Sequence, residues 1–77
     1  MTDPEIILDW CKKREYENID IATVAAIVLH TNIAIAGHAM EKLVETGKAK
    51  WIEDEELCRG RTVIEILNEN ANDSESN

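Results

Sequence analysis

A chain of 77 residues, 44% of them hydrophobic, has room for one small domain with a single core. Its net charge of -8 opposes nucleic-acid binding, because such binding relies on Lys and Arg displacing counterions from phosphates. The two cysteines lack metal-ligand spacing, no signal-peptide pattern is present, and the longest apolar run is far shorter than the ~20 residues of a membrane span. We expect a cytoplasmic protein with no metal, no cofactor, no small-molecule substrate and no membrane partner.

The N-terminal segment has the pattern of a capped helix. Thr2 and Glu5 have the spacing of a capping box, and Pro4 suits the first helical turn. Apolar residues then recur at helical spacing, which predicts a helix over residues 3–15. The residues expected on its inward side are Ile6, Ile7, Trp10 and Cys11.

A short strand and a second helix are expected next. Residues 19–21 alternate apolar and polar over a span that suits one edge strand, and Asp20 can equally cap the following helix. Residues 22–30 are apolar on nearly every side, which is typical of an enclosed helix. Because so small a domain can hardly enclose it, we expect a partner to cover part of its surface.

The central element is the segment of residues 31–47. Thr31 or Asn32 can cap a helix, and Gly47 follows the last apolar residue, where a left-handed backbone ends many helices. The spacing of three and four predicts a buried stripe of Ile33, Ala36, Ala39, Met40, Leu43 and Val44. The residues expected to point outward are Asn32, Ala34, Ile35, Gly37, His38, Glu41 and Lys42.

The remainder predicts a hairpin and a tail. Residues 48–53 alternate and residues 62–67 are rich in β-branched side chains, so the two should pair around residues 54–61. Trp10 and Trp51 are interpreted as core or core-edge aromatics. Residues 68–77 contain one Ala and otherwise polar side chains, which predicts a disordered acidic tail after a domain of residues 1–67.

This order of elements, with the stretches EKLVETGKAKWI and RGRTVIEIL, resembles the winged helix-turn-helix transcription regulators over residues 4–67. CRGRTVIEIL and the length also resemble the small fimbrial-operon regulators of the PapI and FaeA type. The resemblance implies an α+β fold with three helices, a short strand and a C-terminal β-hairpin wing. It further implies a recognition helix within residues 31–46 for the major groove, and a wing tip at residues 59–61 for the backbone or minor groove.

Double-stranded DNA is therefore the expected partner, bound by the protein as a homodimer or beside a larger DNA-bound protein. Residues 21–52 and 57–62, which contain the recognition helix and the wing tip, are the stretches that are not acidic overall. A base-reading helix normally presents Arg, Lys, Asn, Gln or Ser, and few occur here. The candidate DNA-binding residues are Asn32, Ile35, His38, Lys42, Lys48, Arg59 and Arg61.

Alternatives remain open at each of these positions. His38 is equally consistent with an ordinary exposed residue, and Arg59 and Arg61 can pair with the acidic residues 53–56 across the hairpin. The main alternative function is a winged-helix interaction module without DNA binding, in which the apolar second and third helices dock onto a partner. Its candidate residues are Ile27, Ile33 and Ile35. DNA mimicry by the acidic residues is a lesser alternative.

Catalysis and metal binding find little support in the sequence. It contains no phosphate-binding loop, no nucleophile with an adjacent base and no carboxylate pair in apolar surroundings, so we do not expect an enzyme. Cys11, Cys58, His30 and His38 are the only candidates for a metal site, and they are scattered without ligand spacing.

Overall fold

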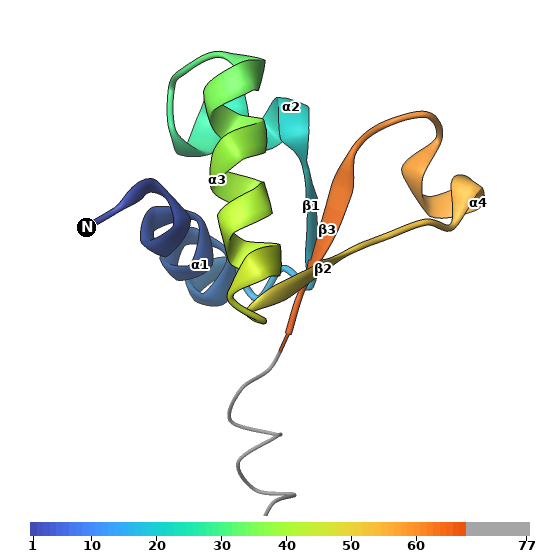
Figure 1. The fold of residues 1–77 in the computed structure, drawn as a ribbon, viewed down its shortest axis with the longest axis horizontal. Helices are drawn as coiled ribbons and strands as arrows, with labels where there is room; N and C mark the ends of the chain where they lie inside the picture. The colour runs from blue at the N-terminus through green and yellow to red at the C-terminus, as the bar shows by residue number, and fades with distance from the viewer. Residues whose placement is uncertain (68–77) are drawn as a thin grey trace, which may run out of the picture.

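The computed structural model describes residues 1–67, in which helices pack against one face of a small antiparallel sheet (Figure 1). The expected α+β class is confirmed. The expected acidic tail, residues 68–77, lies outside the described residues. The elements in chain order are α1 (Asp3–Arg14), β1 (Asn18–Asp20), α2 (Ile21–Thr23), the π-helix η1 (Val24–Val28), α3 (Ile33–Glu45), β2 (Ala49–Trp51), α4 (Glu55–Cys58) and β3 (Val63–Ile66).

Helix α1 begins with the predicted capping box. The Glu5 backbone N–H donates to Thr2 Oγ1 at 3.4 Å, and the Thr2 N–H donates to Glu5 Oε1 at 2.9 Å. Glu5 Oε1 also accepts from the Thr2 hydroxyl at 2.9 Å, and the two bonds that Thr2 donates to this oxygen hold the pKa of the Glu5 carboxyl below its usual range. The helix ends at Arg14, one residue earlier than expected, because Glu15 adopts a left-handed backbone with φ 57°. Its inward side is formed by Ile7 and Cys11, which are fully buried.

The second helix differs from the expectation of one enclosed α-helix over residues 22–30. A single α-turn, α2, leads into η1, where the Leu29 N–H bonds to the Val24 carbonyl five residues back at 2.9 Å. Asp20 stands at the cap position, but its carboxylate accepts from the Thr23 hydroxyl at 2.5 Å and not from the backbone. The domain encloses the segment only in part, as expected from its small size, because Val24 and Val28 are buried whereas Ile27 is 55% exposed.

Helix α3 begins and ends where its caps predict. Asn32 Oδ1 accepts from the Ile35 N–H at 2.9 Å, and Gly47 lies just past the helix with φ 76°. Its buried stripe consists of Ala36, Ala39, Met40 and Leu43, with Val44 partly buried.

For two residues of α3, the spacing of apolar residues predicted the wrong side of the helix. Ile33 was expected in the stripe and is 52% exposed, because it lies about 70° around the helix from the centre of the buried residues. Gly37 was expected to point outward and is only partly exposed. It faces α2 so closely that a Cβ would lie 3.2 Å from Ile21 Cδ1, so an alanine here would require the Ile21 side chain to shift by a few tenths of an ångström.

The three strands form an antiparallel sheet in the order β1-β3-β2. The predicted pairing of the last two strands and the edge position of β1 are confirmed. Ile64 lies opposite both Ile19 and Trp51, and on the other face Lys50 Nζ lies 3.7 Å from Glu65 Oε1. The sequence did not predict α4, which interrupts the connection between β2 and β3 and is capped by Asp54.

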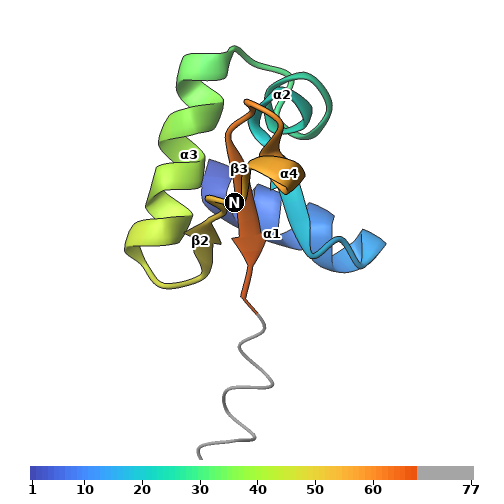
Figure 2. The same ribbon diagram turned by 90° about the vertical axis from the view of Figure 1, so that its right-hand side faces the viewer.

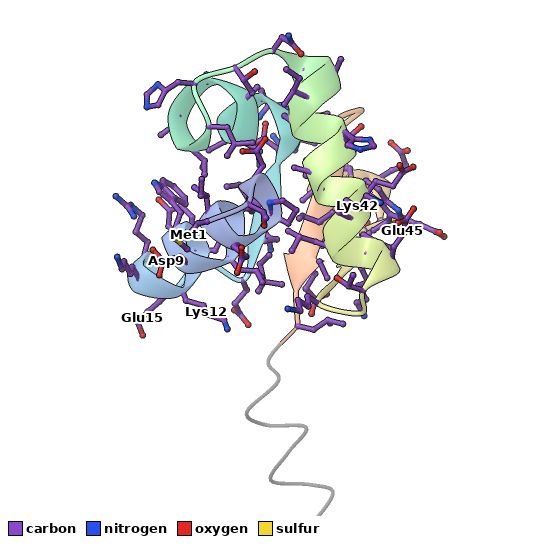
Figure 3. All side chains as sticks on the ribbon, turned by 60° about the vertical axis from the view of Figure 1, so that its left-hand side comes forward. Met1, Asp9, Lys12, Glu15, Lys42 and Glu45 are labelled. Atoms are coloured by element: carbon purple, nitrogen blue, oxygen red, sulfur yellow. The ribbon has the colours of Figure 1, made fainter. Side chains whose placement is uncertain are left out.

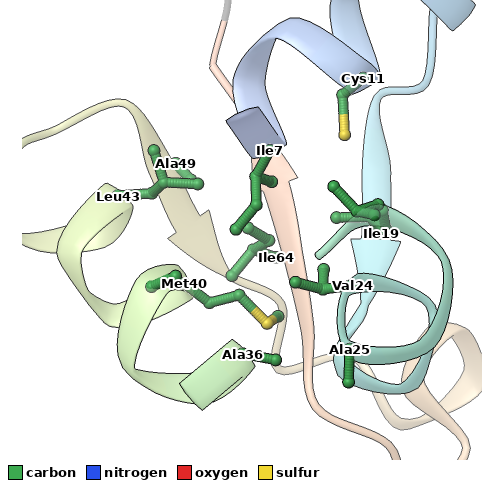
Figure 4. Packing of buried hydrophobic residues seen from close by; sticks show 12 residues of the cluster. Ile7, Cys11, Ile19, Val24, Ala25, Ala36, Met40, Leu43, Ala49 and Ile64 are labelled. Atoms are coloured by element: carbon green, nitrogen blue, oxygen red, sulfur yellow. The ribbon is translucent and has the colours of Figure 1, made fainter. Parts of the chain in front are cut away.

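The core lies between α1, η1, α3 and the sheet, as Figure 4 shows. Met40 projects from α3 into its centre and is fully buried, as is Ile64 from β3. Among the described residues no polar side chain is buried. The core therefore depends on apolar packing alone, and α3 contributes more of it than any other helix.

We expect Met40→Ala to lower the free energy of unfolding by about 2–4 kcal/mol, because it removes a fully buried side chain and leaves a cavity. Urea denaturation followed by circular dichroism would measure this. Ile33→Ala on the same helix serves as the control and should cost less than about 1 kcal/mol, since Ile33 is half exposed. Equal losses in the two variants would contradict this account of the core.

Candidate nucleic-acid interface

The helical period of α3 determines which of its residues face solvent. With about 100° per residue, the positions opposite the buried stripe are Ala34, His38, Glu41 and Glu45, all of which are exposed. Ile35 and Lys42 lie on the flank toward α1, and Ile33 lies on the flank toward α2. The outward face of α3 is thus formed by small, neutral and acidic side chains.

The charges on this face are poorly suited to a polyanion. Glu41 and Glu45 contribute two carboxylates, and the only cation nearby on the helix is Lys42, whose Nζ lies 3.6 Å from Glu45 Oε1. Asn32 was expected to read a base edge, but its carbonyl oxygen already caps the helix. One lone pair of this oxygen and the amide N–H groups remain for a ligand, but the capping bond fixes the orientation in which Asn32 can offer them to a base edge.

The tip of the connection between β2 and β3 presents two arginines. Arg59 and Gly60 have successive left-handed conformations, with φ 49° and 79°. The Arg59 N–H bonds to the Glu55 carbonyl at 2.8 Å and the Arg61 N–H to the Cys58 carbonyl at 2.9 Å, which holds the turn against α4. Both arginine side chains are exposed.

Neither arginine is neutralised by the carboxylates that follow β2. Within residues 1–67 the ion pairs join other residues, so the alternative in which Arg59 and Arg61 pair with residues 53–56 is not observed. The carboxylates are instead directed by α4, whose first turn contains Glu55 and Glu56. Within residues 1–67, the tip therefore has two positive charges that no ion pair neutralises.

The structure divides the predicted DNA-binding residues between two regions. Ile35, His38 and Lys42 line a groove together with Asp3 and Pro4 of α1, and Lys48 lines the adjoining groove. Arg59 and Arg61 instead line a cavity of about 300 Å³ behind the sheet, together with residues of β1. Figure 1 shows α1 and the β2–β3 tip at opposite ends of the molecule, and Figure 2 shows α3 to one side of both.

The three isoleucines predicted for protein docking do not form one patch. Ile33 and Ile35 are both about half exposed but lie about 200° apart around α3. Ile27 lines a third groove, beside Gly60 and Arg61. Sequence reasoning missed Leu57, which is the most exposed apolar residue of α4 at 64%. Asp54 followed by two glutamates was the available signal for α4.

The cysteines and histidines do not come together. Within residues 1–67 no three His, Cys, Asp or Glu side chains are placed to hold a metal ion. Cys11 and Cys58 are separate, buried thiols, and burial raises the pKa of Cys11 to about 11. Burial, with Glu55 and Asp54 nearby, also raises the pKa of Cys58.

No single helix among residues 1–67 is long and apolar enough to cross a bilayer. The segment α2–η1 and helix α3 reach the required length and apolar composition only when they are taken together, and the angle between them is 111°.

No protein-family model matches the chain, and no curated protein or solved structure has significant similarity to it. Functional assignment therefore rests on the geometry and charge of the surfaces described above.

We expect Asn32→Ala to lower the free energy of unfolding by about 1 kcal/mol, because it removes the acceptor that caps α3. Asn32→Asp is the matched variant and should retain full stability, since its carboxylate caps the helix equally well and favours the helix dipole. Thermal and urea denaturation would compare the two. A destabilised Asn32→Asp protein would show that the amide group has a further structural partner.

Proposed function

We propose that the protein is a winged helix-turn-helix regulator that binds duplex DNA, with α3 in the major groove and residues 59–61 at the neighbouring backbone or minor groove. The observation that supports this most directly is a capped helix with an open outer face beside a hairpin tip bearing two unpaired arginines. The strand order supports the proposal as well, because β1 pairs with β3 and so joins the short strand before the second helix to the C-terminal hairpin in one sheet.

The distribution of charge assigns most of the affinity to the wing. Arg59 and Arg61 are available for phosphates, whereas Lys42 lies on the flank of α3 that faces α1, and Lys48, which follows that helix, lines the same groove. Each phosphate contact contributes about 0.9 to the salt slope on B-DNA, so the two arginines give a slope of about -2 and all four cations give about -4. Such a slope corresponds to modest affinity, which a second DNA-bound protein would raise.

Base recognition through α3 would be narrow in this arrangement. His38 can donate or accept at a base edge, and Glu41 can accept from the N4 amino group of cytosine. Ala34 offers an apolar contact for a thymine methyl group. We therefore assign sequence preference to His38, Glu41 and Ala34, and electrostatic affinity to the arginines.

Replacing both Arg59 and Arg61 by Ala should weaken binding to duplex DNA and reduce the magnitude of the salt slope by about 2. Fluorescence anisotropy of a labelled duplex at several salt concentrations would measure both quantities. Lys13→Ala is the control, because Lys13 lies on α1 and pairs with Asp9 at 3.1 Å. Unchanged affinity in the double variant would contradict the role of the wing.

Glu41→Gln should tighten binding to mixed-sequence duplex by roughly 2- to 5-fold at low salt, because it removes an exposed carboxylate from the face directed at the phosphates. Glu17→Gln makes the same charge change in the connection between α1 and β1 and should have a smaller effect. The same anisotropy titration compares them. Equal effects of the two variants would mean that net charge matters and that α3 does not approach the DNA.

A further inference from the structure

A continuous groove runs between α1 and α3 on the side of the molecule away from the wing. Two adjoining hollows of about 480 and 520 Å³ form it, and they share Pro4 and Lys42. We call this the α1–α3 groove. Along α3 and its C-cap it extends from Ala34 to Thr46, which is about 18 Å or a little more than three helical turns. Figure 3 views α1 and α3 from this side, with Lys42 labelled.

The floor of the α1–α3 groove is apolar. It is formed by Pro4 and Leu8 from α1 and by Ile35, Ala39 and Leu43 from α3. Ile35 is 45% exposed, whereas Ala39 and Leu43, which follow it along the floor, are buried in the core. An exposed Ile at the end of a groove of this length is a suitable anchor point for another apolar side chain.

The two rims of the α1–α3 groove have opposite charge. Asp3 and Glu5 lie on the α1 rim, and Lys42 and Lys48 line the other. Lys42 pairs with Glu45, but both side chains are more than half exposed, so the pair is weak and can be exchanged for another carboxylate. The groove therefore favours an occupant with an apolar stripe, acidic residues along one flank and basic residues along the other.

We propose that the α1–α3 groove binds an amphipathic helix of a partner protein, about three turns long, with acidic residues against Lys42 and Lys48 and basic residues against Asp3 and Glu5. A helix suits the groove because anchors at positions i, i+3 or i+4, and i+7 span the floor from Ile35 to Leu43. An added strand does not, because the groove is bounded by helices, and the sheet edges are β1 and β2.

This chain does not supply the occupant. Residues 68–77 contain a single Ala and no larger apolar residue, so they offer no apolar stripe. A second copy would oppose one concave groove to another, and two concave surfaces leave the floor unfilled. The proposal does not rest on DNA binding, but Ala34, His38 and Lys42 line the groove, so a bound helix would compete with DNA for this part of α3.

The test is a selection of 14-residue helical peptides from a display library on the immobilised full-length protein, followed by anisotropy with the enriched peptides and no DNA. We expect apolar residues at the stated spacing with one acidic flank. Ile35→Asp should weaken peptide binding at least tenfold. Ile33→Asp, on the other flank of α3, should change it less than twofold. Both substitutions place an acid in the first helical turn, where the dipole favours it, so both variants should fold.

A second pair of variants tests the charged rim. Reversing Lys42 and Lys48 to Glu together should weaken the acidic-flanked peptides at least fivefold, whereas Lys13→Glu should not. Enrichment of no helical pattern, or equal losses with Ile33→Asp and Ile35→Asp, would overturn the proposal. A dimer in sedimentation experiments that Ile35→Asp dissociates would also overturn it, because the occupant would then be a second copy.

Discussion

The way α3 packs on the core determines every other surface of this protein. Ala36, Ala39, Met40 and Leu43 bury one side of the helix without any polar contact. Because each residue turns the helix by about 100°, the position of the buried stripe fixes the direction in which every other residue of α3 points. His38 and Glu41 must face solvent, Ile35 must face α1, and Ile33 must face α2.

Local chemistry made much of the fold predictable. Thr2, Asn32 and Gly47 marked helix boundaries correctly, because capping depends on residues within one turn of each other. Strand pairing of β2 with β3 was predictable for the same reason, since alternation and chain proximity determine a hairpin. These features require no knowledge of distant packing.

The errors occurred where tertiary geometry matters. Apolar spacing includes Ile33 in the stripe, but only the position of α2 decides how far around the helix the burial extends. No side chain in the segment that forms η1 indicates whether a backbone N–H bonds to the carbonyl four residues back, as in an α-helix, or five residues back, as in a π-helix. The site was predicted as one set of residues, and the sequence alone could not reveal that Lys42 and Arg59 face different regions.

The position of α3 between two different surfaces suggests how an acidic chain can act on DNA. One flank of the helix adjoins α1 and a groove with Lys42 and Lys48, while the wing tip presents Arg59 and Arg61 on the other side. Acidic residues near α3 limit the affinity that this domain alone can reach for phosphates. A partner helix in the α1–α3 groove would cover Ala34, His38 and Lys42, and its acidic residues would neutralise two of the four cations available to DNA. Under the two proposals, partner binding and insertion of α3 into the major groove therefore oppose each other, and Arg59 and Arg61 are the cations that stay accessible in both states.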